Sequence, residues 1–158
     1  MATRARPTTS VKDRALRLLA VRSRSRHELH ARLLRAGYEA DEVEAALSDL
    51  EAVGLIDDER FARELAEHHR RRGMGRRAGM SALRSKGVDR DLAERTVDEV
   101  QPDDDAELAF ELARARLERL RSLSPDVVSR RLFGFLVRRG YEPQIARSAV
   151  QRALTEGR

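Results

Sequence analysis

Histidine residues are the first candidates for metal chemistry in this sequence. His27 and His30 lie three residues apart, whereas the helical metalloprotease motif places its two zinc-binding histidines four residues apart. His68 and His69 are adjacent, so on a helix they point to different faces, and the chain has no cysteine to complete a zinc site. We interpret all four as polar surface residues and predict no metal site.

Acidic clusters at residues 57–59 and 103–105 offer carboxylates that could hold a hard cation. Both clusters precede stretches with helical apolar spacing, and negative charge there stabilises the positive end of a helix dipole. The chain contains no glycine-rich phosphate loop after a strand and no Gly-x-Ser-x-Gly nucleophile motif. The sequence therefore predicts a protein that is not an enzyme and has no catalytic residue, no cofactor and no small-molecule substrate.

Arginine is the residue type that dominates the remaining chemistry. Of the 32 Lys and Arg residues 30 are Arg, whose planar guanidinium suits phosphate and carboxylate groups. The net charge of +5 conceals an alternation of basic and acidic segments. The segment charges are +8 for residues 1–37, −9 for 39–67, +7 for 68–90, −8 for 91–111 and +7 for 112–158.

The densest basic stretch surrounds the turn at residues 73–75, where five arginines fall within eight residues and are expected to lack nearby acids. Because these charges repel one another, the stretch predicts a surface that binds phosphate or an acidic protein face. A solvated helix face with ion pairs between residues four apart is the alternative interpretation. The predicted partner-binding or DNA-binding residues are Arg24, Arg26, Arg70, Arg71, Arg72, Arg76, Arg77, Arg130, Arg131, Arg138 and Arg139.

The composition predicts an all-α protein. Hydrophobic residues make up 41% of the 158 residues, aromatic residues only 4%, and tryptophan is absent, so Leu, Ala and Val must build the core. Richness in alanine, leucine, arginine and glutamate favours helices. No apolar run approaches the roughly 18 residues of a membrane span, and the absence of cysteine fits a reducing compartment. We expect a cytoplasmic protein that does not bind membranes.

Local signals predict where helices end and begin. Gly54 follows an apolar-periodic run and can adopt the left-handed conformation that ends a helix. Asp57 is the predicted N-cap of the next helix, and Ile56 and Phe61 have the spacing of a hydrophobic staple across that cap. Residues 25–28 form a predicted capping box, with serine at the N-cap and glutamate three residues later. With similar signals elsewhere, the chain is predicted to contain nine helices and no sheet.

Three glycines mark an internal repeat. Gly37, Gly87 and Gly140 are separated by 50 and then 53 residues, and each has a leucine four positions before it. A unit of about 45 residues is small for a single core, so neighbouring units are expected to bury surface against each other. We predict three tandem three-helix repeats that form an elongated, curved all-α body. The predicted parts are a disordered basic arm at 1–10 and repeats at 11–54, 55–101 and 102–158.

Two motifs carry a resemblance to a known family. They are Ser23-Arg24-Ser25-Arg26-His27-Glu28-Leu29 and the segment from Gly54 to Ala62. Together with the tandem three-helix units, over roughly residues 15–154, they resemble the RecX family of recombinase regulators. The resemblance implies a modulator that lies in the groove of the RecA–DNA filament and inhibits its recombination and ATPase activities. It also implies DNA, in single-stranded form, as a secondary contact.

A free-standing, sequence-independent DNA-binding protein is the alternative, because three-helix units can be helix-turn-helix readers. The third helices of the first two units are expected to carry acidic outer faces, which would meet phosphate with the wrong sign. Those acids are Glu39, Asp41, Glu42, Glu44, Asp91, Glu94, Asp98 and Glu99. The charge pattern thus disfavours docking of these helices in the major groove and leaves contact through the basic helices open.

Overall fold

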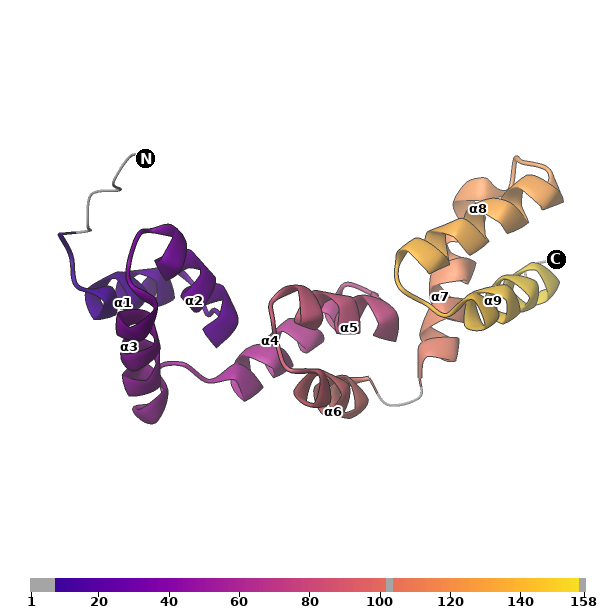
Figure 1. Cartoon of the computed structure of the whole chain (residues 1–158). Coiled ribbons are helices and arrows are strands. Elements are labelled where there is room, and N and C mark those ends of the chain that lie inside the picture. Colours follow the sequence, from indigo (N-terminus) through magenta and orange to yellow (C-terminus); the bar gives the residue numbers. More distant parts are fainter. Residues whose placement is uncertain (1–7, 102–103, 157–158) are drawn as a thin grey trace.

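The computed structural model describes residues 8–101 and 104–156, and in these ranges it contains nine α-helices, one short 3-10 helix and no strand (Figure 1). The prediction of an all-α fold is therefore confirmed. The helices are α1 (Val11–Val21), α2 (Arg26–Arg35), α3 (Ala40–Ala52), α4 (Asp58–Arg71), α5 (Arg76–Ser85), α6 (Arg90–Val100), α7 (Asp105–Leu117), η1 (Glu118–Leu120), α8 (Pro125–Arg138) and α9 (Pro143–Glu156).

The helices pack as three consecutive groups of three, each around its own hydrophobic core. Leu29, Leu33 and Leu47 lie in the first core, and Leu83 and Val97 lie in the second. The third core is the largest and includes Phe110, Leu132, Leu136 and Tyr141. Figure 1 shows the three units in a curved row, as the repeat predicted.

Every unit uses the same glycine turn between its second and third helices. Gly37, Gly87 and Gly140 have φ values of 96°, 71° and 89°, which glycine adopts without a Cβ clash. The residue after each glycine donates its backbone N–H to the carbonyl of the leucine five residues earlier, at 3.2 to 3.3 Å. This is the hydrogen bond of a Schellman motif, so each turn ends its helix in the same way.

The connection between the first two units also follows the sequence signals, with one exception. Gly54 has a φ of 72°, and the Asp57 carboxylate accepts the backbone N–H of Arg60 at 2.9 Å as the N-cap of α4. The predicted hydrophobic staple is wrong, because Ile56 belongs to the first core and Phe61 to the second. Each of the two side chains is drawn into the core of its own unit.

The predicted capping box at the start of α2 is half formed. Ser25 Oγ accepts the backbone N–H of Glu28 at 3.1 Å, as expected of an N-cap. The Glu28 carboxylate does not return the bond; it forms ion pairs with Arg22, Arg24 and Arg32. Three arginine side chains therefore hold the carboxylate that the capping box would have used.

The beginning of the predicted arm lies outside the described residues, but its end belongs to the first unit. Ser10 Oγ accepts the backbone N–H of Asp13 at 3.1 Å and so caps α1. The Thr9 carbonyl accepts the hydroxyl of Tyr38 at 2.9 Å. These two bonds tie residues 9 and 10 to the first core.

The second helices of the three units meet end to end. The carbonyl of Lys86, at the end of α5, accepts the hydroxyl of Ser25 at the start of α2. At the next junction Gly75 donates its N–H to the carbonyl of Arg139 at 2.8 Å, and Arg77 donates to the carbonyl of Gly140 at 3.1 Å. Each negative helix end thus faces the positive end of the preceding unit's helix, which is a favourable alignment of dipoles.

A carboxylate supports each of these junctions. Asp58 Oδ1 accepts the backbone N–H of Arg26 at 2.8 Å, and Asp105 Oδ2 accepts that of Arg76 at 3.0 Å. Asp58 and Asp105 are the first residues of α4 and α7, the helices that open the second and third units. The two junctions are therefore built from the same parts.

Candidate partner interface

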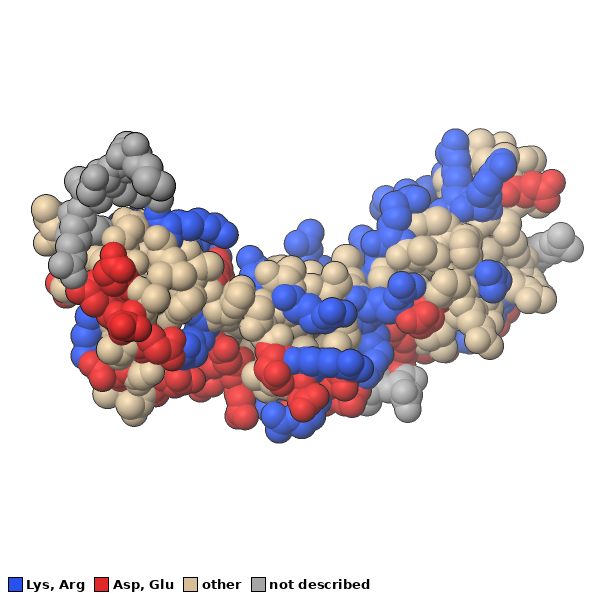
Figure 2. Space-filling view, viewed as in Figure 1, with Lys and Arg blue, Asp and Glu red and all other residues tan. Residues whose placement is uncertain are grey.

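The surface charge is divided between the two long sides of the molecule. Figure 2 shows Lys and Arg gathered along the upper, concave side from the second to the third unit, whereas Asp and Glu gather along the lower side of the first two units. The acidic helices α3 and α6 lie on that lower side, and α5 and α8 lie above (Figure 1). The alternating charge of the sequence becomes a separation of charge across the body.

The predicted binding residues of the first unit are held by bonds within the protein. Arg24 is only 7% exposed, and its guanidinium donates to the Leu18 carbonyl at 3.1 Å and to Glu28 at 2.9 Å. Arg26 donates to Glu44 at 2.6 Å and to Glu51 at 3.2 Å, which joins α2 to α3. Arg24 and Arg26 thus stabilise the fold of the first unit.

The Arg26–Glu44 pair also changes the protonation of its members. The hydrogen bond that Arg26 donates to Glu44 raises the pKa of the Arg26 guanidinium and lowers the pKa of the Glu44 carboxyl. Both groups therefore stay charged over a wider pH range than free side chains would. The pair is at the protein surface, so solvent screens its contribution to stability.

The arginines around the turn at residues 73–75 do have acidic neighbours, and the expectation that they lack them is wrong. The fold brings carboxylates from α4, α6, the start of α7 and the turn before α9 to these guanidinium groups, and four of the five arginines are paired. The ion pairs are Arg70–Asp104, Arg71–Glu67, Arg76–Asp98 and Arg77–Glu142. The exposed Arg72 forms no ion pair with a described residue.

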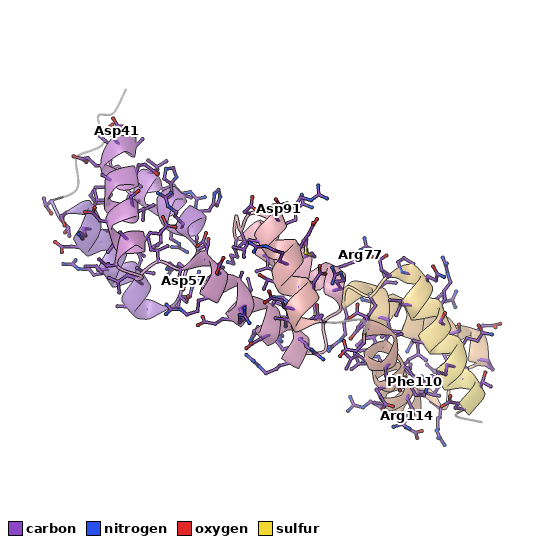
Figure 3. All side chains as sticks on the ribbon, turned by 90° about the horizontal axis from the view of Figure 1, so that it is seen from below. Asp41, Asp57, Arg77, Asp91, Phe110 and Arg114 are labelled. Atoms are coloured by element: carbon purple, nitrogen blue, oxygen red, sulfur yellow. The ribbon has the colours of Figure 1, made fainter. Side chains whose placement is uncertain are left out.

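Arg77 and Arg139 lie at the junction of the second and third units. Figure 3 places Arg77 there, and the carboxylate with which it pairs, Glu142, comes from the third unit. Arg139 donates from Nη1 to the carbonyls of Arg72 and Gly73 at 2.5 and 3.3 Å. Both arginines therefore join the units to each other.

The third unit contains a group of arginines without carboxylate partners. Arg116, Arg130, Arg131 and Arg138 line a cavity of about 440 Å³ between the end of α7, Leu120 and α8, which we call the four-arginine cavity. None of the four forms an ion pair with any residue that the structure describes. Arg116 was missed in the sequence, because only the packing of α7 beside α8 brings it to the other three.

Two further cavities are more neutral or more apolar. One of about 780 Å³ lies along α5 and α6 and contains Arg84, Met80 and Glu94. The other, of about 540 Å³, lies between α8 and α9 and contains Phe133 and Leu154. In the parts of the chain that the structure describes, no group of three or more His, Asp or Glu residues could hold a metal ion.

Burial shifts the pKa of four further residues. Burial lowers the pKa of His69, and burial raises the pKa of Tyr141 to about 12. Burial also raises the pKa of Asp58 and of Asp105, although each accepts a backbone hydrogen bond at a junction. None of the helices in the described ranges combines the length and the apolarity that crossing a membrane requires.

These features define a helical-repeat protein in which Lys and Arg gather on the concave side of the second and third units, while Asp and Glu gather on the lower side of the first two (Figure 2). Family models of the first, second and third three-helix domains of RecX match residues 12–50, 57–97 and 103–150. The chain belongs to the RecX family, as the two sequence motifs indicated.

Curated relatives and solved structures agree with this assignment. The chain is 37% identical over 140 residues to the regulatory protein RecX of Amycolatopsis mediterranei, covering 88% of this chain and 80% of the relative. It is 41% identical over 133 residues to that of Mycobacterium avium, covering 83% and 77%. The crystal structure of RecX from Lactobacillus salivarius matches with a TM-score of 0.78 at 20% identity, covering 92% of this chain and 95% of the other. The last comparison supports the fold.

Proposed function

We propose that this protein binds the RecA recombinase filament on DNA and inhibits its recombination and ATPase activities. The family assignment supports a regulatory role, since the curated relatives are named regulatory proteins. The protein acts by binding, in the cytoplasm, without a cofactor or a small-molecule substrate. DNA, in single-stranded form, is a second contact within the complex.

The division of charge across a curved body is the observation that carries the proposal (Figure 2). A filament of protein on DNA presents both phosphate and protein surfaces along a helical groove. The basic concave side suits the phosphate, and the acidic α3 and α6 suit basic faces of the recombinase subunits. An elongated row of three units can contact several subunits at once, which increases affinity without new kinds of contact.

A free-standing DNA-binding protein is the second candidate, and the unpaired arginines of the third unit favour it. Such a protein would use only the basic side. The acidic side then has no role in binding, and its charges would weaken the attraction to phosphate. The two candidates thus differ in what the acidic helices do.

Sedimentation separates the two candidates. We expect the protein to pellet with RecA filaments at concentrations at which it does not bind bare single-stranded DNA of the same length. ATP hydrolysis by the filament should fall as the protein pellets. Equal binding to the filament and to the bare DNA would favour the free-standing DNA-binding protein. Binding to the filament that leaves its ATP hydrolysis unchanged would favour it too.

A further inference from the structure

The four-arginine cavity concentrates positive charge that the protein does not neutralise. Arg130, Arg131 and Arg138 are exposed on α8, and Arg116 reaches them from the last turn of α7. Elsewhere in the third unit Arg114, Arg121 and Arg152 have carboxylate partners, whereas Arg119 and Arg147 form no ion pair with a described residue but do not line this cavity. Like charges gathered in one cavity repel one another unless an anion occupies the space between them.

Two of the four side chains are held in place by contacts that leave their donors free. The guanidinium carbon of Arg116 lies 4.4 Å from the centroid of the Phe135 ring, a cation–π contact, and its N–H groups form no hydrogen bond with a described residue. Arg138 lies back over Gly134, where a Cβ atom would be 3.1 Å from its Nη1. The N–H donors of both groups stay available to a ligand.

We propose that the four-arginine cavity is the place where the protein binds the sugar–phosphate backbone of nucleic acid. This inference rests on the proposed function and assigns its DNA contact to the third unit. From Arg130 to Arg138 the helix rises about 12 Å, at 1.5 Å per residue. That length covers about three to four phosphates along one DNA strand, which are spaced by about 3.4 Å along the duplex axis. A chain of phosphates therefore fits the row of arginines better than a single phosphate does.

Arginine itself favours phosphate in this cavity. Its planar fork of donors bonds two phosphate oxygens at once, and three of the four arginines stand on one helix that can follow a backbone. None of the described residues that line this cavity is aromatic, and the nearby Phe135 ring is contacted by Arg116 and by Arg139, whose guanidinium carbon is 4.9 Å from the ring centroid. Binding at this cavity is therefore expected to be independent of sequence and strongly dependent on salt.

The test compares two triple variants of the full chain that remove the same formal charge from the same unit. The site variant carries Arg130→Gln, Arg131→Gln and Arg138→Gln. The control carries Arg114→Gln, Arg121→Gln and Arg152→Gln, which are exposed arginines paired with Glu111, Glu118 and Glu107. Circular dichroism and thermal unfolding verify that both variants are folded, and a labelled oligothymidylate is titrated at several salt concentrations.

The site variant is expected to bind the oligonucleotide at least tenfold more weakly than the wild type. Its slope of log affinity against log salt should fall by about two, because three fewer phosphates are neutralised at about 0.7 each. The control should lose less than half as much slope. Equal losses in the two variants would overturn the proposal, since they would show that only the total charge matters.

Competition separates a nucleic-acid site from a general acidic-face site. Unlabelled oligothymidylate should displace the labelled strand from the wild type, and polyglutamate of equal charge should do so far less well. Equal displacement by polyglutamate would reject nucleic acid as the ligand. Sedimentation of the wild type with RecA filaments is measured in parallel. Failure of the wild type to bind filaments would contradict the proposed function, whereas an unchanged salt slope in the site variant would contradict only this inference.

Discussion

Gly87 lies directly against the side chain of His27, at the point where the end of α5 meets the start of α2. A Cβ atom on Gly87 would be 2.1 Å from Cγ of His27, and the φ of Gly87 is +71°. Position 87 therefore requires glycine for two reasons, the left-handed backbone and the close contact with His27. Gly54 shares only the first reason, because its φ is +72° but a Cβ atom there would meet nothing within 4 Å.

This pair of glycines gives a matched test of the junction. Gly54→Ala should cost about 1–2 kcal/mol, the usual penalty of a left-handed alanine. Gly87→Ala should cost more, because the imidazole of His27 must also move and the two units must separate. Urea unfolding measures the stabilities, and small-angle X-ray scattering measures the shape. Equal costs with an unchanged scattering profile would show that the contact does not fix the arrangement of the units.

Replacing Asp57 tests the start of α4. Because its carboxylate accepts the N–H of Arg60 at 2.9 Å, Asp57→Ala should lose about 0.5–2 kcal/mol of stability. Asp57→Ser retains an N-cap oxygen and should lose much less. Thermal unfolding at neutral pH compares the three proteins. An alanine variant that melts with the wild type would show that this cap contributes nothing.

The half-buried carboxylate of Asp58 predicts a pH dependence of stability. Burial raises its pKa above 3.8, so the folded state binds its proton more tightly than the unfolded state does. The resulting stability is present below pH 3.8 and is lost as the pH rises through the folded-state pKa. Asp58→Asn keeps an oxygen to accept the N–H of Arg26. Its free energy of unfolding should therefore rise relative to that of the wild type between pH 3 and pH 7.

Denaturant unfolding at a series of pH values checks this expectation. Asp57→Asn is the control, because it removes one negative charge from the same end of α4 at an exposed position. The stability difference between Asp58→Asn and the wild type should be largest near neutral pH. A difference that grows toward acid pH would contradict the raised pKa.

Short-range signals explain why so much of the fold could be predicted. The turns at Gly37, Gly54 and Gly87 are specified by a glycine and the few residues beside it. Gly54 has the predicted left-handed backbone, and Gly37 and Gly87 adopt the same conformation. The partners of the arginines could not be predicted in this way. Arg70 pairs with an acid 34 residues away and Arg76 with one 22 residues away, so only the packed structure shows that they are neutralised.

The four-arginine cavity could not be predicted from the sequence for the same reason. Arg116 and Arg130 are on different helices, and their spacing in the sequence carries no periodic signal. The neighbouring Arg114 illustrates the difficulty, since it pairs with Glu111 and lies 5.8 Å from the ring of Phe110 (Figure 3). Arg114 is thus neutralised by an ion pair, whereas Arg116, two residues later, lines the four-arginine cavity. The two differ because they lie on different faces of α7 and so have different neighbours.

The acidic side offers the sharpest test of what the protein binds. Asp41 and Asp91 are exposed near the starts of α3 and α6 and form no ion pair with a described residue (Figure 3). They are therefore better targets than Glu44, which pairs with Arg26, or Asp49, which pairs with Lys12. Reversing both to lysine changes the charge of that side by about four, at a cost of about 0.3–1 kcal/mol for each helix end.

The double variant Asp41→Lys, Asp91→Lys should bind bare single-stranded DNA severalfold more tightly than the wild type, because repulsion from phosphate is removed. Its affinity for RecA filaments should stay the same or fall, because the acidic side faces protein there. Titrations on both partners at two salt concentrations measure the two changes, and Asp41→Asn, Asp91→Asn reports the effect of losing charge without reversing it. An equal gain on DNA and on filaments would show that the acidic helices meet no protein, and partner choice would then depend on the basic side alone.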